Sequence, residues 1–438
     1  MTKQVSALKL VRWADRICEF SFLGAVFFLP FSKAILEILL FISSTAWIMS
    51  KIINNDSFSK DRTIFIIFGF FVITSSISAF NSGYPILAVR GILKLLRYGL
   101  SMLVAADLFR DSYKLKKLLM TGLASLSLVL IDTLFQNISG KDLFFNLPVR
   151  YANQEIRLTG PYKSYGLLGA HLICALPILF SFILSIPKKN NQAVLKKIAW
   201  ICLLLVGLYT LYKTNSRGAW LAALASWVLY AFMIRNKWLI IFFLGTIITM
   251  PFILPKSVLF HLDAFNQEQS LVERSLLWSR AMRVIESNPI FGCGINTYIR
   301  NYQKYGDKGI SKHEIIYQNY AHVAEKETWR VPGHPSHIPD YYVHNGYLQL
   351  AAETGLLSLV LFLLLLGKGI WSGFLAFRNS EGKKKFLIGG LFCGFIALLF
   401  QATVDTTLHN LQSAVLIWLF LGLLFAVGAV TNTNKHEK

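Results

Sequence analysis

The sequence has few charged residues, and the acidic ones are the scarcest. Only 15% of its 438 residues are charged, with 23 Asp and Glu against 44 Lys and Arg, while 54% are hydrophobic. A chain this apolar would aggregate in water, which excludes an ordinary soluble domain. The apolar residues form runs of about 20 and do not alternate, so we predict membrane-spanning helices rather than a membrane β-barrel.

Cysteine is also scarce. Four of the five cysteines fall in expected helices and one in a loop, and neither a CxxC nor an HExxH motif occurs. We therefore expect no disulfide bond and no thiolate metal site. The cysteines are Cys18, Cys174, Cys202, Cys293 and Cys393.

Twelve apolar runs divide the chain. They lie near 17–32, 34–50, 63–80, 86–106, 115–137, 164–186, 196–212, 217–234, 237–254, 346–370, 385–404 and 411–430. Basic residues precede the first run and no small-residue cleavage site is evident. The first run is therefore expected to be an uncleaved helix and not a signal peptide.

The formal net charge of +21 would suit nucleic-acid binding, but the basic residues are distributed differently. Of the 44, 23 lie in alternate loops and at the two ends: 3–16, 51–62, 110–117, 188–197, 235–237, 378–385 and 435–438. Cytoplasmic loops of membrane proteins are enriched in Lys and Arg in this way. Both termini are therefore expected in the cytoplasm, and no nucleic-acid partner is predicted.

This topology places four segments on the far side of the membrane: 138–163, 213–217, 255–345 and 405–410. The third is large, and helical spacing of apolar residues over 270–287 predicts an amphipathic helix within it. We predict an all-α integral membrane protein of about 12 transmembrane helices with one large periplasmic loop. The expected divisions are N-terminal helices (1–150), a core (151–430) and a cytoplasmic tail (431–438).

His344 stands where the polar, aromatic segment 333–343 meets a long run of Leu and Val. An imidazole can act as a base near neutral pH. The mouth of a membrane helix is also where a lipid-borne substrate meets water. The same position suits a histidine that only caps the helix, and both interpretations stay open on position alone.

Three arginines fall in the far-side segments, where the distribution of basic loops does not explain them: Arg157, Arg217 and Arg274. Arg280 and Arg283 follow on the predicted amphipathic helix. Arginine binds phosphate oxygens bidentately and stays charged, and helix starts at Ser164 and Ser216 would also favour an anion. The alternative for each arginine is an anchor for lipid head groups.

Four short motifs follow one another along this side of the chain. They are Arg157-Leu158-Thr159-Gly160, then Ser216-Arg217-Gly218-Ala219-Trp220-Leu221-Ala222, then Glu273-Arg274-Ser275-Leu276-Leu277-Trp278 with Asn288-Pro289-Ile290-Phe291-Gly292-Cys293-Gly294, and last His344-Asn345 with Gly355. Over roughly 150–430 their order and spacing resemble the O-antigen ligase/polymerase superfamily. Ser358, and Lys163-Ser164 after the first motif, differ from the residues usual there.

The resemblance implies a glycosyltransferase of the bacterial inner membrane that needs no metal and no other cofactor. Its donor would be a glycan on polyprenyl diphosphate, and its acceptor a lipid A–core sugar or another glycan at the periplasmic face. Arg157, Arg217 and Arg274 would bind the diphosphate, and His344 would take the proton from the acceptor hydroxyl. Fixed guanidinium groups that stabilise the departing diphosphate fit this chemistry.

Glu353 and Arg280 are candidate supporting residues. A carboxylate inside a membrane helix is costly and is usually paired or functional, so Glu353 is expected to orient a donor-binding arginine or to pack against another helix. Arg90, Lys94 and Arg97 form one basic stripe on the fourth run. The stripe would escort a lipid diphosphate, snorkel to the interface, or pair with Asp132 or Glu37.

Two other classes of function stay open. His334, His337, Asp340 and His344 would suit zinc, although the Pro-rich sequence around His334 fixes no ligand geometry. A transporter would use the membrane charges Glu37, Asp132 and Asp405 to line a path. Against a transporter, no repeat of two halves is visible, and the candidate site residues gather on one side of the membrane.

Within the enzymes, a ligase and a polymerase need the same diphosphate site and the same base. They differ in the acceptor pocket, expected in the loop 295–343. That loop is rich in aromatic residues suited to sugar stacking: Tyr298, Tyr302, Tyr305, Tyr317, Tyr320, Tyr341 and Tyr342. The His-Asn motif and the size of the loop favour the ligase.

Overall fold

A computed structural model describes residues 2–56, 61–152, 155–187, 190–253, 268–306 and 342–436. Each of the twelve apolar runs lies largely in a helix. These helices are α1 (Thr2–Phe28), α2 (Lys33–Asn54), α3 (Arg62–Ile77), α4 (Pro85–Leu108), α5 (Ser112–Ser139), α6 (Tyr165–Ser185), α7 (Asn191–Lys213), α8 (Arg217–Met233), α9 (Lys237–Ile253), α14 (Gly346–Arg378), α15 (Gly382–Gln401) and α16 (Leu411–His436). Two further helices, α11 (Glu268–Ser287) and α12 (Tyr298–Gly306), follow α9. The amphipathic helix predicted at 270–287 is thus present as α11.

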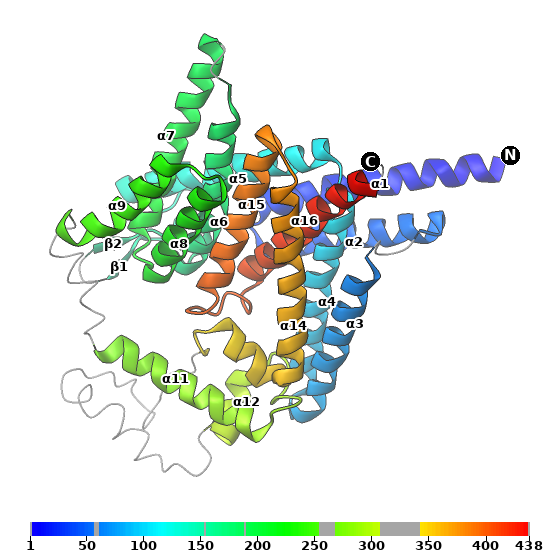
Figure 1. The fold of residues 1–438 in the computed structure, drawn as a ribbon. Coiled ribbons are helices and arrows are strands. Elements are labelled where there is room, and N and C mark those ends of the chain that lie inside the picture. The colour runs from blue at the N-terminus through cyan, green and yellow to red at the C-terminus, as the bar shows by residue number, and fades with distance from the viewer. Residues whose placement is uncertain are drawn as a thin grey trace.

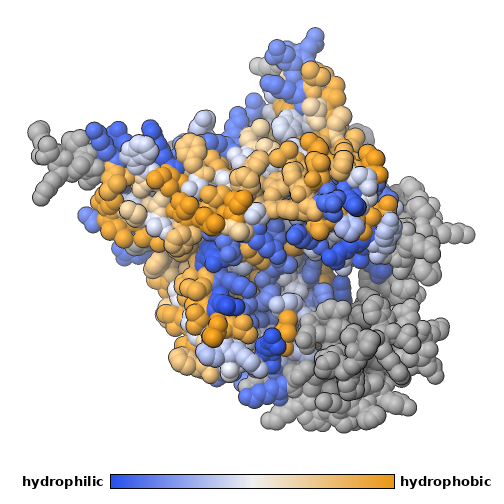
Figure 2. Space-filling model, turned by 180° about the vertical axis from the view of Figure 1, so that it is seen from behind, coloured by the Kyte–Doolittle hydropathy of each residue, from blue (hydrophilic) through white to orange (hydrophobic). Residues whose placement is uncertain are grey.

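Eight helical stretches of the described chain are long and apolar enough to cross a membrane, whereas α8 and the apolar part of α9 are shorter. Figure 2 shows hydrophobic side chains as a broad band across one face, with hydrophilic residues gathered below it. Large apolar side chains that would contact lipid include Phe41, Phe65, Trp238 and Trp371. The helical membrane class is therefore confirmed, and the count of twelve spans and the side of each loop stay predictions.

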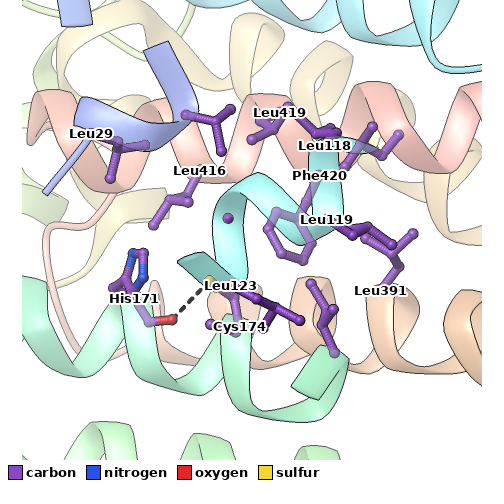
Figure 3. Close-up of a pocket in the computed structure, with 15 residues that line it drawn as sticks. Leu29, Leu118, Leu119, Leu123, His171, Cys174, Leu391, Leu416, Leu419 and Phe420 are labelled. Atoms are coloured by element: carbon purple, nitrogen blue, oxygen red, sulfur yellow. Dashed lines mark hydrogen bonds between the residues drawn. The ribbon is translucent and has the colours of Figure 1, made fainter. Parts of the chain in front are cut away.

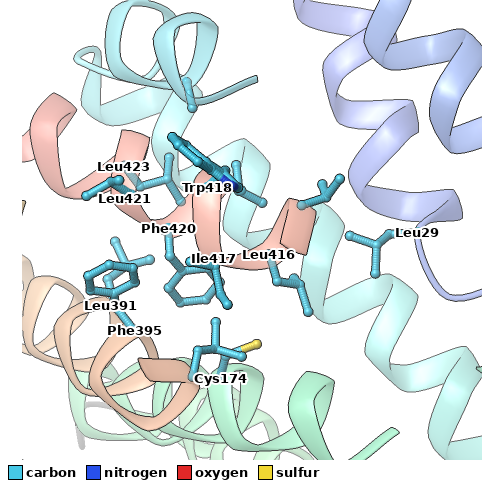
Figure 4. Packing of buried hydrophobic residues seen from close by; sticks show 14 of the residues in the cluster. Leu29, Cys174, Leu391, Phe395, Leu416, Ile417, Trp418, Phe420, Leu421 and Leu423 are labelled. Atoms are coloured by element: carbon cyan, nitrogen blue, oxygen red, sulfur yellow. The ribbon is translucent and has the colours of Figure 1, made fainter. Parts of the chain in front are cut away.

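The centre of the bundle is α16, which packs against α4, α6, α14 and α15 (Figure 1). Glycines allow these helices to approach closely, as is common between membrane helices. A Cβ on Gly422 would lie 2.4 Å from the carbonyl oxygen of Met102 on α4. A Cβ on Gly394 of α15 would lie 2.6 Å from the carbonyl oxygen of Cys174 on α6. Figure 4 shows the buried side chains that α16 contributes to this core.

Aromatic rings hold α16 against α3 and α14. Trp418 of α16 stacks on Phe71 of α3 at a centroid distance of 6.1 Å, and Phe71 stacks on Phe362 of α14 at 5.6 Å. All three rings are buried, and each aromatic pair adds about 0.5–1.5 kcal/mol beyond the area that it buries. The result is a rigid support for α14.

On the other side of α16, an apolar cavity lies between α5, α6, α15 and α16 (Figure 3). His171 lines it, and its Nδ1 lies 2.7 Å from the hydroxyl of Tyr162. Tyr162 ends the short 3-10 helix η2 (Gly160–Tyr162). The hydrogen bond therefore ties the loop that follows Arg157 to the helical core.

The fold differs from the all-α prediction in one small element. Strands β1 (Arg150–Ala152) and β2 (Glu155–Arg157) form an antiparallel hairpin that pairs Arg150 with Arg157. Strands of three residues leave too short a pattern of alternation for the sequence to reveal them.

The second difference is a break in α14. Its backbone leaves the helical region at Gly355, with φ 84° and ψ 168°, so that 346–354 and 356–378 are separate helical segments. In Figure 1 the first, yellow part lies across the direction of the orange remainder, beside α12. The single helix expected at 346–370 is therefore wrong, and the first segment carries its own N-terminus.

Candidate functional site

His344 immediately precedes the first segment of α14 and faces Asp405. Its Nδ1 lies 3.8 Å from Oδ1 of Asp405, and the two side chains are 41% and 36% exposed. Asp405 belongs to the loop between α15 and α16. The amide of Gly346 donates to the carbonyl of Ala402 in that loop at 2.7 Å, which holds the histidine and the carboxylate side by side.

The backbone of His344 is left-handed, with φ 53°. A non-glycine residue adopts this conformation only when its surroundings hold it there. The side chain of Asn345 supplies part of that support, because its Oδ1 accepts hydrogen bonds from the amides of Tyr347 (3.0 Å) and Leu348 (3.1 Å). Asn345, and not His344, is therefore the N-cap of α14.

Arg157 ends β2 and lies against the turn between α7 and α8. Its Nη2 donates to the carbonyl of Asn215 at 2.7 Å, and its guanidinium stacks 3.9 Å from the ring centre of Tyr165. Next to it, the amide of Leu158 donates to the carbonyl of Lys213 at 3.0 Å. The hairpin is thus attached to the residues just before Arg217.

Arg217 is the first residue of α8. The small residues that follow it in the motif allow the start of this helix to pack closely on its neighbours. A Cβ on Gly218 would lie 2.7 Å from Cγ2 of Val404, the neighbour of Asp405. A Cβ on Gly169 of α6 would lie 2.9 Å from Cβ of Ala219. The start of α8 therefore packs on both the Asp405 loop and the start of α6, which brings Arg217 to the end of the bundle that holds His344.

Arg274 projects from α11, half-buried, and completes a cluster of positive charge. The charges of both Arg157 and Arg274 act on the guanidinium of Arg217. Within the part of the chain that the structure describes, no ion pair joins any of the three to a carboxylate. Three like charges close together, with no counterion among the described residues, would favour an anion with several negative charges.

Two helix N-termini meet at this cluster. Ser164 precedes α6 and Ser216 precedes α8, and neither side chain makes a capping hydrogen bond. The first amides of both helices therefore keep their capacity to bind an anion. A Cβ on Gly166 would lie 3.1 Å from Oδ2 of Asp405, so the start of α6 also touches the carboxylate that faces His344.

The segment 288–294 inserts into the break of α14 and connects α11 to the histidine. A Cβ on Gly355 would lie 1.9 Å from the carbonyl oxygen of Ile290, so no larger residue fits at that glycine. Three main-chain hydrogen bonds close the junction: Cys293 N to Ala352 O (2.9 Å), Gly294 N to Glu353 O (2.9 Å) and Leu356 N to Pro289 O (2.8 Å). The motif that follows Arg274 and the motif that begins at His344 thus form one unit.

Glu353 supports this junction through amides. Its carboxylate accepts hydrogen bonds from the amide of Asn296 (2.8 Å), the amide of Tyr298 (3.4 Å) and the side-chain Nε2 of Gln349 (2.8 Å). Among the described residues no arginine is hydrogen-bonded to it. The carboxylate therefore fixes the chain between α11 and α12.

Arg280 lies apart from the three clustered arginines. It is 2% exposed, and its guanidinium lies 5.1 Å from the ring centre of Tyr302 on α12. The apolar cluster around Tyr302 includes Val343, the residue before His344. This places Arg280 in the support of the histidine turn, and its part in donor binding stays a prediction.

Two charged residues of the basic stripe on α4, and the carboxylates Glu37 and Asp132, each interact with other partners. Arg97 pairs with Glu37, and Lys94 donates to Oδ1 of Asn296 at 3.1 Å. Asp132 accepts from the amide of Leu143 at 2.6 Å. Each of these groups therefore has a partner of its own, and a transport path through the bundle stays a prediction.

The proposed zinc ligands His334, His337 and Asp340, and the tyrosine-rich part of the acceptor loop at 307–341, lie outside the described residues. Within the described ranges no three His, Cys, Asp or Glu side chains are grouped to hold a metal ion. Sequence reasoning did not pair Asp405 with His344. The only signal was a carboxylate at the start of the short turn 405–410, on the same expected side as His344.

Residues 201–363 match the family model described as O-Antigen ligase. No curated protein matches the chain. The matched region contains Arg217, Arg274, His344 and the whole junction at Gly355, whereas Arg157 and Asp405 lie outside it. The resemblance to the O-antigen ligase superfamily, expected from the four motifs, is therefore confirmed over residues 201–363.

Proposed function

We propose that the protein is an O-antigen ligase, which transfers a glycan from polyprenyl diphosphate to a hydroxyl of a lipid A–core sugar. The reaction would take place at the periplasmic face of the bacterial inner membrane. The proposal rests on one observation: a candidate base, with its carboxylate partner, lies close to a group of positive charges. A histidine–carboxylate pair, His344 and Asp405, adjoins the helix start that bears Arg217, whose charge is joined by those of Arg157 and Arg274.

The three arginines would bind the diphosphate of the donor. When the bond between the anomeric carbon and the diphosphate oxygen breaks, negative charge grows on that oxygen. Guanidinium groups already in place stabilise this charge without rearranging, and such preorganised groups are worth several kcal/mol each in a partly dry site. The uncapped starts of α6 and α8 add amide donors to the same region.

His344 would accept the proton of the acceptor hydroxyl as its oxygen forms the new bond to the anomeric carbon. The imidazole becomes an imidazolium, and Asp405, 3.8 Å away, stabilises that positive charge. The products are the glycosylated acceptor and free polyprenyl diphosphate. The proton leaves from His344 to water, since the side chain is partly exposed.

The glycan profile of a deletion strain separates the ligase from a polymerase that uses the same donor. Lipopolysaccharide and the polyprenyl carrier are analysed together. Bare core with long polymer accumulating on the carrier is the result expected for the ligase. Core that carries a single repeat and no ladder would instead identify a polymerase, and an unchanged profile would refute both for this glycan.

A further inference from the structure

A chain of hydrogen bonds runs from Glu353 to the residue before His344. Nε2 of Gln349 donates to Oε1 of Glu353 at 2.8 Å, and Oε1 of Gln349 accepts from the amide of Val343 at 3.1 Å. Gln349 is 3% exposed, Glu353 is 6% exposed and Val343 is fully buried. The three residues thus form a buried relay that ends at the peptide bond leading into the histidine.

The chemistry of the partners fixes the direction of the relay. The carboxylate of Glu353 accepts the amide of Asn296 on Oε2 and the amide of Tyr298 on Oε1, the oxygen that also accepts from Gln349, and it can only accept when ionised. The amide of Val343 can only donate. A glutamine between them therefore has one satisfactory orientation, with its nitrogen toward Glu353 and its oxygen toward Val343.

We infer that Gln349 is a positioning residue for His344. This role rests on the proposed function. The histidine has a left-handed backbone that its neighbours must hold. Gln349 holds the amide of Val343 before it, and the bond from Gly346 to Ala402 holds the chain after it. Together these bonds direct the imidazole toward Asp405.

The relay also gives the base a fixed place relative to the diphosphate site. Glu353 anchors Gln349 to the segment 293–298, which is joined to the helix that bears Arg274. A displacement of about 1 Å at a reacting group can lower the rate by about 100-fold. Gln349 is therefore expected to affect the chemical step and not the binding of the donor.

The decisive variants alter the relay in three ways. Gln349→Leu removes both hydrogen bonds at similar volume. Gln349→Glu places two carboxylates next to each other, which repel unless one of them holds a proton. The double exchange, Gln349→Glu with Glu353→Gln, restores a donor–acceptor chain. In it the amide nitrogen at position 353 donates to the carboxylate at position 349, and that carboxylate accepts from the amide of Val343. The amide oxygen at position 353 keeps the bond from Asn296, and only the longer bond from Tyr298 is lost.

The measurement is glycan transfer by the purified full-length variants in lipid vesicles, with kcat and the KM for the lipid-linked donor determined separately. We expect Gln349→Leu to lose about 100-fold in kcat with little change in donor KM. The activity of Gln349→Glu relative to the wild type at the same pH is expected to rise as the pH is lowered from about 7.5 to about 5.5, where a shared proton restores the hydrogen bond, whereas protonation of His344 lowers the activity of both proteins. The double exchange is expected to recover most of kcat at about pH 7.5.

Gln412→Leu is the matched control. Gln412 is also a buried glutamine, and its Nε2 donates to the carbonyl of Leu29 at 2.8 Å, in a contact that leaves out the histidine turn. It is expected to lower the melting temperature to a similar extent while kcat is retained. An unchanged kcat in Gln349→Leu, or a loss in Gln349→Glu that neither acid nor the double exchange relieves, would overturn the inference.

A second readout keeps this inference separate from the proposed function. The ring signal of His344 in a histidine-labelled NMR spectrum, assigned by its loss in His344→Ala, reports the environment of the imidazole without any transfer. We expect this signal to shift in Gln349→Leu and to stay in place in Gln412→Leu. No transfer by the wild-type protein would refute the function alone, whereas an unmoved signal in Gln349→Leu would refute the positioning role.

Discussion

Gly218 and Val404 lie in direct contact, and this contact joins the two halves of the site. A Cβ on Gly218 would be only 2.7 Å from Cγ2 of Val404. Because Gly218 follows Arg217 and Val404 precedes Asp405, the approach of these two backbones determines how near the proposed diphosphate site lies to the proposed base.

Enlarging Gly218 should therefore separate the two halves. We expect Gly218→Leu to lower transfer by about 100-fold, since α8 must move away from the Asp405 loop. Gly69→Ala is the control, because a Cβ there meets nothing within 4 Å. Transfer rates of the two purified variants decide the matter, and full activity in Gly218→Leu would show that the contact does not set the geometry.

Arg217 should be indispensable for transfer but not for insertion into the membrane. Removing one donor to a developing oxyanion typically costs about 100- to 1000-fold in kcat, and we expect at least that for Arg217→Ala. Arg217→Lys should be intermediate, because an ammonium group keeps the charge but loses the bidentate geometry. Arg378→Ala, at the far end of α14, serves as the control, and normal activity in Arg217→Ala would remove this residue from the donor site.

Asp405 should act through the charge of its carboxylate. In Asp405→Asn the imidazolium formed at His344 lacks its counter-charge, so we expect kcat to fall by about 10- to 100-fold. Asp405→Glu, which keeps the charge, should retain more activity than Asp405→Asn. The comparison of kcat in the two variants is the test, and equal losses would mean that the shape of the side chain matters and its charge does not.

Gly355 should tolerate no side chain, in contrast to another glycine of the same helix. Gly355→Ala forces a Cβ to within 1.9 Å of the carbonyl oxygen of Ile290 at a positive φ, and we expect it to destabilise the protein by about 3 kcal/mol or more. Gly367→Ala meets nothing within 4 Å and should be neutral or slightly stabilising. Thermal unfolding in detergent compares them, and equal stability would contradict the packed junction.

His409 should make the fold sensitive to acid. Burial and the nearby charge of Lys94 lower the pKa of His409 to about 4, below the value of about 6.5 for an unfolded chain. Above pH 6.5 the residue is neutral in both states and has no effect. Between about 6.5 and 4 only the unfolded state binds the proton, so stability falls as the pH falls, by roughly 1–2 kcal/mol at pH 5. The melting temperature of His409→Gln should therefore decline less than that of the wild type over this range, and parallel curves would contradict the assignment.

The sequence predicts the helices well because twenty apolar residues in succession have few alternatives in a membrane. It also brings forward Arg157, Arg217 and Arg274, whose position in the chain is unusual for basic residues. Hydropathy does not predict the break at Gly355. Apolar residues predominate on both sides of it, although Glu353 and Thr354 precede it directly, and the cause of the break is a contact with Ile290, 65 positions earlier.

The pairing of Asp405 with His344 and the relay through Gln349 are hidden for a related reason. Sixty-one positions separate Asp405 from His344, and only the return of the chain after α15 brings them together. Gln349 resembles any polar residue near the end of a membrane helix. Its meaning depends on the left-handed turn at His344, and neither composition nor spacing indicates such a turn.

Because α14 is broken at Gly355, one part of it can cross the membrane while another part positions His344. An unbroken helix would have to do both. A continuous helix that tilts to match the thickness of a bilayer carries the residue at its end along with it. Here the proposed base precedes a short segment whose carbonyls at Ala352 and Glu353 accept from the amides of Cys293 and Gly294, and the long apolar part begins only at Leu356, whose amide donates to Pro289. The spanning part of α14 can therefore follow the membrane while the histidine keeps its place beside the arginines.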